Sequence, residues 1–339
     1  MNQKTGISRR RFIDGAAAGS LAVAAAVPMR LHAQTKWRLR YISFAGKSSI
    51  WSQPYAELAK QVEQRSGGEL QIDWVGGPEV VGAFQAAEAI SKGVFDIAHS
   101  AGSYYADAVP EAISMSSGRA SQSALYASGV VDFLDQIHQK KLGVKVLSMA
   151  TSGVGFIFLW REQPKDLSSF KGKKFRSIPI FDPVLRALGA TGVTVAPSEV
   201  YTALERGVVD GIGWPEITIK EYGYHERAKF LMRPAFFASR TPHLINLRAY
   251  ERLPKQLQTV LRESARAAGE VADKAFRGIA EAELAAMKEK GLVESPLSPQ
   301  DAKAFIQLTE DTLWSRIAQI APDNAPRLRE LYSKAESMS

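Results

Sequence analysis

Two segments indicate how this chain is built: KGKKFRSIP at residues 171–179 and PSEVYTALERGVVDGIGW at residues 197–214. The first is a basic approach to a short apolar strand. In the second, a helix that Ser198 caps and Gly207 ends is followed by an apolar strand at residues 208–212. The two segments therefore predict a strand, a helix and a second strand of one α/β sheet.

The two predicted strands lead to side chains that could bind a ligand. Arg176 ends the first strand, and Trp214 stands just past the second. In open α/β sheets, ligands collect at the carboxyl ends of strands. A guanidinium can hold a carboxylate through two parallel hydrogen bonds, and tryptophan offers a flat apolar wall with one N–H donor. From the residues alone, a salt-bridged surface arginine and a core tryptophan are the alternatives.

The same alternation of strands and helices extends to both sides of these segments. Strands are predicted at residues 37–44, 70–75 and 94–98, with helices between them, which is typical of a mostly parallel sheet covered by helices. Residues 121–140 are predicted to form one helix. The apolar stripe of residues 254–290 predicts another, about 50 Å long at 1.5 Å per residue.

The composition is that of a globular protein long enough for two domains: 339 residues, 45% of them hydrophobic. The net charge of +8 falls to +4 without the first 33 residues, and this modest excess argues against a nucleic-acid partner while suiting anions. The chain has no cysteine. This excludes disulfides, thiolate metal sites, cysteine nucleophiles and the lipidated cysteine of a bacterial lipoprotein.

The amino terminus has the pattern of a secretory signal. SRRRFI at residues 8–13 precedes a small-residue apolar run at 15–27 and then LHA at 31–33. The arginine pair followed by phenylalanine indicates the twin-arginine route. The apolar run is shorter than the roughly 20 residues that span a bilayer, so a membrane anchor is the weaker interpretation. We predict a twin-arginine signal peptide at residues 1–33 and export to the periplasm.

Residues 170–176 and 198–211 resemble the patterns "lkGlKiR" and "sEvYtALqrGvvDg" of the DctP-like solute-binding proteins of tripartite ATP-independent periplasmic (TRAP) transporters. Residues 65–72, RSGGELQI, resemble the family's "kTgGrvki", and residues 86–97 resemble its "e.leal..GtvDm". The resemblance covers nearly all of the chain after the predicted signal.

The resemblance implies a fold of the α/β class, a two-lobed, type II-like periplasmic binding protein. Each lobe is then a mixed, mostly parallel sheet flanked by helices, and the long predicted helix joins the lobes. TSGVG at residues 151–155 suits a hinge. We expect domain I at 36–153 plus 241–283 and domain II at 154–240 plus 284–339.

The resemblance also implies a set of ligand-binding residues. Arg176 falls on the family's carboxylate-binding arginine, and Trp214 falls where many members place a side chain against the ligand. Phe156 lies near a position where some dicarboxylate- and sialate-binding relatives carry a second arginine. The apolar ring predicts a less charged ligand, a monocarboxylate with an apolar or aromatic body.

The first half of the chain carries a further likeness, to the branch that binds 2-oxo acids. GPEVVGAF at residues 77–84 and HSAGSYY at 99–105 carry it. In that branch a tyrosine reaches the ligand. The other predicted ligand-binding residues are Tyr104, Ser100, Glu216 and Tyr201.

A metal bridges the ligand to the protein in that branch, held by a glutamine and by a glutamate. The corresponding positions here are Gly155 and Gly213. Because hard cations need oxygen ligands and glycine has no side chain to offer one, we predict no metal and no cofactor. Glu216 is the alternative oxygen donor near this position.

These observations predict the solute-binding subunit of a TRAP transporter. It captures a small organic acid in an interdomain cleft and delivers it to the membrane permease, as a monomer or dimer. One alternative is a periplasmic ligand-binding adaptor that docks on a membrane sensor.

A carboxylate-processing enzyme is the other alternative. The five histidines show no metal-ligand spacing, and neither a G-x-S-x-G elbow nor a Walker loop is present. His99 could form an acid–base pair with Asp96 or with Glu216.

Overall fold

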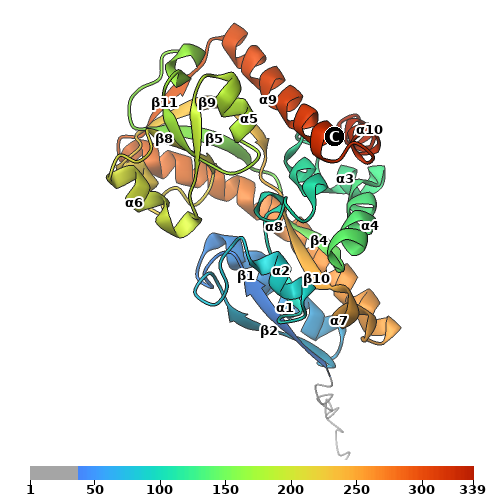
Figure 1. The fold of residues 1–339 in the computed structure, drawn as a ribbon. Coiled ribbons are helices and arrows are strands. Elements are labelled where there is room, and N and C mark those ends of the chain that lie inside the picture. The colour runs from blue at the N-terminus through green and yellow to red at the C-terminus, as the bar shows by residue number, and fades with distance from the viewer. Residues whose placement is uncertain (1–36) are drawn as a thin grey trace, which may run out of the picture. The chain divides into compact units, whose positions relative to one another are not determined.

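Two mixed β-sheets organise the computed structural model, which describes residues 37–339 (Figure 1). The first sheet has the order β2 (Leu70–Gly76), β1 (Trp37–Ser43), β3 (Ile97–His99), β10 (Thr241–Asn246) and β4 (Val144–Thr151). The second has the order β11 (Val293–Pro296), β9 (Phe230–Ala238), β5 (Gly155–Trp160), β8 (Gly211–Pro215), β6 (Lys174–Ser177) and β7 (Thr191–Thr194). The predicted signal peptide lies outside the described residues.

The pairing of the strands is parallel and antiparallel in both sheets. In the first, β1 is parallel to β2 and β3, and β10 is antiparallel to β3 and β4. In the second, β6 is parallel to β7 and β8, β9 is parallel to β11, and β5 is antiparallel to β8 and β9. The expected mixed sheets are present, although the described part of the first is evenly divided between the two kinds of pairing.

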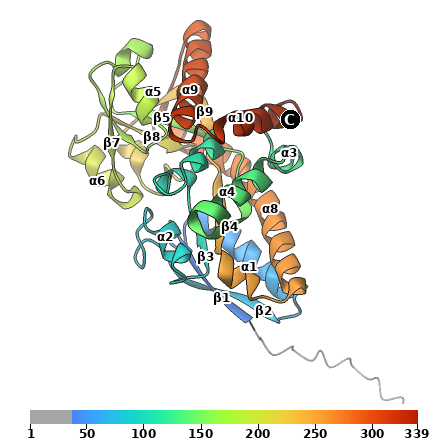
Figure 2. The same cartoon turned by 45° about the vertical axis from the view of Figure 1, so that its right-hand side comes forward.

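Helices cover both sheets (Figure 2). They are α1 (Gln53–Arg65), α2 (Ala86–Ser91), α3 (Gln122–Ser128), α4 (Val130–Leu142), α5 (Asp182–Ala187), α6 (Val200–Glu205), α7 (Leu247–Glu251), α8 (Lys255–Glu289), α9 (Pro299–Ile320) and α10 (Ala325–Glu336). The region predicted as one helix at 121–140 is two, α3 and α4, because Gly129 adopts a left-handed φ of 89° between them. Ser198 does not cap α6: it lies inside a 3₁₀ turn, Pro197–Glu199, that begins at the proline.

The chain crosses between the sheets at three places. Residues 152–154 lead from β4 to β5, and Ser239 and Arg240 lead from β9 to β10. The Ser239 amide donates to the Val154 carbonyl over 2.8 Å, so these two crossings lie side by side. The third is α8, drawn in orange in Figure 1, which begins and ends within one residue of the predicted helix.

The long helix α8 contributes to the cores of both sheets. Leu257 and Leu261 are buried in the cluster under the first sheet, together with Leu39. Met287, near the other end of the helix, is buried with Ile212 of the second sheet. A stiff helix that packs into both cores fixes the two sheets to one common element. The two domains and their limits remain a prediction.

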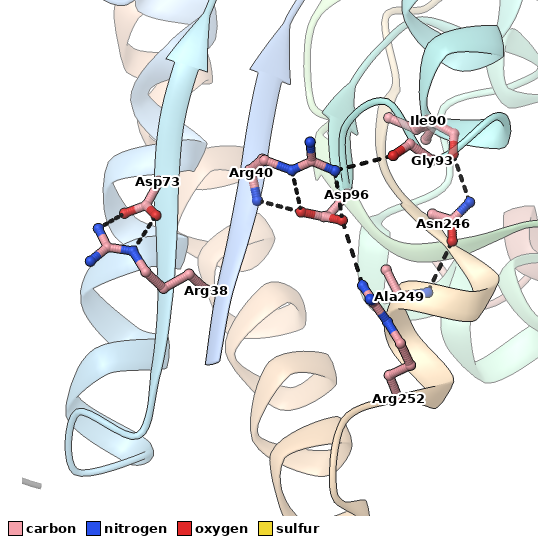
Figure 3. A network of polar contacts seen from close by, with 9 residues as sticks. All are labelled: Arg38, Arg40, Asp73, Ile90, Gly93, Asp96, Asn246, Ala249 and Arg252. Carbon is pink, nitrogen blue, oxygen red and sulfur yellow. Dashed lines mark hydrogen bonds and ion pairs between the residues drawn. The ribbon is translucent and has the colours of Figure 1, made fainter. Parts of the chain in front are cut away.

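A polar network holds the first sheet together away from the crossings (Figure 3). Asp96, just before β3, accepts hydrogen bonds from the backbone N–H and the guanidinium of Arg40 on β1, over 2.8 and 3.1 Å. Asn246 donates to the Ile90 carbonyl over 2.7 Å and accepts from the Ala249 N–H, which caps α7. These bonds tie β1, α2, β3 and α7 into one unit.

Candidate ligand-binding site

A small pocket lies at the ends of strands from both sheets, next to the crossing between β9 and β10. Its volume is about 40 Å³, and a single water needs roughly 10–15 Å³ on the same scale. It is lined by Phe44, Trp51 and Tyr104 on the side of the first sheet, by Phe156, Arg176 and Trp214 on that of the second, and by Ser239, Arg240 and Thr241 of the crossing. Four residues of the predicted ligand-binding set thus share one pocket: Arg176, Trp214, Tyr104 and Phe156.

Arg176 is buried in this pocket with 1% of its surface exposed. It comes from β6, an interior strand between β7 and β8. Its Nε donates to the Val195 carbonyl over 3.1 Å and Nη1 to the Gly213 carbonyl over 3.2 Å, whereas Nη2 has no partner among the described residues. A salt-bridged surface arginine, the alternative interpretation of this residue, does not fit these contacts.

The charge of Arg176 has no acidic neighbour among the described residues. Burial lowers its pKa, and the neighbouring groups that counteract the shift are the phenols of Tyr104 and Tyr224. None of the described residues that line the pocket is acidic. Because a buried charge is costly unless it is paired, this guanidinium is suited to receive the negative group of a ligand.

Aromatic side chains form the walls around Arg176. The guanidinium carbon lies 4.8 Å from the centre of the Trp214 ring, a cation–π contact. Burial raises the pKa of Tyr104, and the Arg176 charge partly opposes that rise, so the phenol stays protonated beside the guanidinium. The Phe156 ring packs edge to face on Phe181, 5.0 Å between centres. Together they surround one cation with apolar surface.

Trp214 and Trp51 are joined through Thr218. The indole N–H groups of both tryptophans donate to Thr218 Oγ1, over 3.1 and 3.2 Å. Trp51 follows β1 of the first sheet and Trp214 lies on β8 of the second. Glu283 of α8 accepts the Thr218 N–H over 2.8 Å, and burial raises the pKa of Glu283. Through these hydrogen bonds, Thr218 connects the two sides of the pocket.

Three residues of the predicted set lie outside the pocket lining. Glu216 forms an ion pair with Arg233 and accepts the Gly155 N–H over 2.8 Å. Tyr201, on α6, donates to Glu226 over 3.2 Å. Ser100 is buried next to the pocket, and its hydroxyl has no partner among the described residues.

Sequence reasoning missed Arg240, which lines the pocket with 3% of its surface exposed. It also missed the aromatic residues Phe44, Trp51 and Tyr222. One signal could have indicated Arg240: it stands at the predicted domain boundary, alone between the apolar runs that form β9 and β10. The aromatic residues carry no such signal, because a core position explains them equally well.

The residues present do not suit a metal ion at this pocket. The side chains of the described lining residues offer hydroxyls and two cations, and no carboxylate. A Cβ at Gly213 would stand 2.6 Å from the Phe181 ring, and one at Gly155 would stand 2.9 Å from the Ala235 Cβ. The two positions compared with metal ligands are therefore packed closely against neighbouring side chains.

A buried histidine pair lies behind the pocket and does not form the acid–base pair considered above. His99 Nε2 bonds to Thr241 Oγ1 over 2.7 Å, and His243 Nε2 bonds to the Tyr41 hydroxyl over 3.0 Å. Burial lowers the pKa of both rings, that of His243 to about 3. Asp96 is bonded to Arg40 and Glu216 to Arg233. The two histidines are thus neutral, and His99 is bonded to a residue that lines the pocket.

Comparison with known proteins gives one consistent answer. The model of the DctP family, described as bacterial extracellular solute-binding protein, family 7, matches residues 42–319. A monocarboxylate 2-oxoacid-binding periplasmic protein of Nostoc sp. is 25% identical over 251 residues, which are 71% of this chain and 66% of that protein.

Solved structures share the fold at low sequence identity. A TRAP periplasmic solute-binding protein from Desulfovibrio salexigens with bound orotic acid has a TM-score of 0.80 at 20% identity, covering 89% of this chain and 99% of that one. One from Colwellia psychrerythraea with bound calcium and pyruvate has a TM-score of 0.80 at 19% identity, covering 90% and 95%. Within residues 37–339, no helix has the length and apolar character needed to cross a membrane.

Proposed function

Because this chain belongs to family 7 of the bacterial extracellular solute-binding proteins, we propose that it is the solute-binding subunit of a TRAP transporter. It captures a small monocarboxylate between its two sheets and presents it to the membrane permease. The observation that carries this proposal is Arg176, a buried guanidinium with an unpartnered Nη2 and no acidic neighbour among the described residues. A carboxylate completes its hydrogen bonds and balances its charge in one step.

The pocket supports binding without chemistry. Its described lining carries two arginines, phenols, indoles and hydroxyls, and the histidines behind it are neutral and bonded to protein groups. The relatives named above are a binding protein for monocarboxylate 2-oxo acids and proteins solved with orotic acid or with pyruvate. We extend the carboxylate part of that chemistry to this chain and expect no turnover of the ligand.

The ligand drives closure because it touches both sides of the pocket. A carboxylate on Arg176 binds the side of the second sheet, while its body contacts Trp51, Phe44 and Tyr104 on the side of the first. A ligand shifts an equilibrium only by its differential affinity for the two states. Contacts to both sides exist only in the closed form, which the permease then recognises.

Replacement of Arg176 by alanine tests the proposal. Removing one partner of a buried charge pair costs about 2–5 kcal/mol, so affinity for the best acid of a calorimetric screen should fall about 30-fold or more. The unliganded variant should remain folded, because removal of an unpaired buried charge offsets part of the cost of losing the bonds to the Val195 and Gly213 carbonyls.

Arg186→Ala is the matched control. Arg186 is an exposed arginine on α5, the helix that follows β6 in the chain. Its loss therefore removes the same charge without altering the pocket. Equal affinities of the Arg176 variant and the wild type would remove this arginine from the mechanism. Turnover of a carboxylate by the purified protein would favour the enzyme alternative.

The periplasmic location and the twin-arginine route belong to the same proposal and rest on the amino-terminal sequence. Replacing Arg9 and Arg10 by lysine should leave the protein in the cytoplasm. Cells that carry only this variant should not take up the acid found by calorimetry, whereas the wild-type gene restores uptake. Cell fractionation gives the first result and transport of labelled acid the second; periplasmic variant protein would contradict the route.

A further inference from the structure

Arg240 is a second buried cation at the pocket, and most of its donors are already in use. Nη1 donates to the carbonyls of Met115 and Ser117 over 3.1 and 2.6 Å, and Nη2 donates to that of Ala120 over 2.8 Å. Its Nε is buried and has no partner among the described residues. Arg240 therefore holds the loop at residues 115–120, and its Nε N–H stays available for another acceptor.

Acidic side chains bind the loop that Arg240 holds, whereas Arg176 has no acidic neighbour among the described residues. Glu310 of α9 accepts from the Ser117 hydroxyl and the Gly118 N–H over 3.1 and 3.0 Å, and Glu336 of α10 accepts the N–H groups of Arg119 and Ala120, each over 2.7 Å. Both carboxylates thus accept hydrogen bonds from the same loop whose carbonyls accept from Arg240. Burial lowers the pKa of Arg240, and the Tyr332 phenol and the carboxylates of Glu336, Asp273 and Glu310 partly oppose that shift.

This difference assigns different ligand groups to the two arginines. A carboxylate at Arg176 meets a cation with no acidic neighbour among the described residues. A second carboxylate at Arg240 would approach a loop that Glu310 and Glu336 already bind. Placing a second negative charge there gains little attraction and loses its hydration. A neutral oxygen needs only the free N–H.

Building on the function proposed above, we propose that Arg240 Nε is a second polar subsite that binds a neutral acceptor oxygen of the ligand. The preferred ligands are then monocarboxylates that carry a carbonyl or hydroxyl oxygen, in preference to both the unsubstituted acid and the dicarboxylate. Ser116 and Ser239 line the same pocket and offer hydroxyl groups as further neutral donors.

Matched acids test this subsite in the unaltered protein. In the first series, calorimetry compares butanoate with 2-oxobutanoate, 2-hydroxybutanoate and 3-hydroxybutanoate, and includes butanedioate as the dianion. In the second series, it compares 3-phenylpropanoate with 2-oxo-3-phenylpropanoate. A hydrogen bond to a charged donor should make at least one oxygenated acid bind about tenfold tighter than its unsubstituted partner. Butanedioate should bind more weakly than that acid. An advantage below threefold in both series overturns the subsite.

The variants Arg240→Gln and Arg240→Lys separate recognition from support of the loop. If Arg240 only holds the loop, both members of a pair lose affinity by the same factor. If its Nε binds the oxygen, the advantage of the oxygenated acid over its unsubstituted partner falls to within twofold, whatever affinity the unsubstituted acid itself loses. An unchanged advantage in a folded variant overturns the proposal, and if neither variant folds, the wild-type comparison alone decides.

The same experiment distinguishes failure of this inference from failure of the function. Acids that bind without discrimination leave the carboxylate-binding function standing and remove the subsite. If none of these acids and none of a wider organic-acid screen binds, the proposed function fails and the subsite fails with it.

Discussion

Arg176 and Arg240 are both buried at one pocket, but different groups balance their charges. Arg176 bonds to two backbone carbonyls and has the phenols of Tyr104 and Tyr224 near it. Arg240 bonds to three carbonyls, and acidic side chains act on it. Carbonyls satisfy N–H groups without cancelling the positive charge. The first arginine is therefore the place for an anion, and the second is primarily a support whose Nε has no partner among the described residues.

The buried histidines make stability depend on pH. Burial lowers the pKa of His243 to about 3 and that of His138 to about 4, whereas an unfolded histidine titrates near 6.5. Below pH 6.5 the unfolded chain therefore binds protons that the folded chain does not. The stability that this provides is complete above pH 6.5 and declines as the pH falls toward the folded pKa values.

We predict that the free energy of unfolding falls between pH 7 and pH 5. Each buried histidine contributes up to about 1.4 kcal/mol per pH unit below 6.5. Urea unfolding at several pH values measures this slope. His243→Gln should show a smaller slope than the wild type, although it is less stable at pH 7 because the bond to Tyr41 changes. Equal slopes would show that His243 does not titrate as its burial implies.

At the scale of single elements, local sequence signals placed most strands and helices. β6 carries Arg176 as the apolar strand indicated, and α8 follows its apolar stripe over 35 residues. β8 begins at Gly211, later than the strand predicted at 208–212, so Trp214 lies within the strand and not past its end. The errors lie at starts and breaks. Ser198 is a good capping residue, but Pro197 begins a 3₁₀ turn that takes Ser198 inside, and the left-handed Gly129 divides a continuous apolar pattern into two helices.

The loop that follows β8 shows how one element is positioned by another. Thr218 has a φ of 66°, which is unusual for a β-branched residue. Glu283 on α8 accepts the N–H groups of Thr218 and Lys220, over 2.8 and 2.6 Å. These bonds hold the strained backbone in place, so that the Thr218 hydroxyl meets both tryptophans. No periodicity in the sequence indicates the bond between Thr218 and Glu283, because these residues are 65 positions apart.

At the scale of the whole molecule, the shared bond at Thr218 should favour the closed form. Opening breaks the bond from Trp51 and leaves the one from Trp214, so a single hydrogen bond of about 1 kcal/mol distinguishes the two states. We predict that Thr218→Val weakens ligand binding about fivefold and increases the radius of gyration of the liganded protein, measured by small-angle scattering.

Thr202→Val is the matched control for this change, because Thr202 is an exposed threonine on α6. It should leave both affinity and radius of gyration unchanged. A Thr218 variant that matches the wild type in both measurements would show that this bond does not stabilise closure.

The sequence alone was sufficient for the α/β class, the family and four residues of the pocket, because strand ends, helix stops and the Arg176 motif are local patterns. Only the tertiary structure brought Arg240, Trp51 and Phe44 to the same pocket and turned Glu216 toward Arg233. Their placement depends on contacts between the two sheets and the crossings that join them. A side chain's partners across such contacts are set by packing in three dimensions, and residue spacing along the chain does not record them.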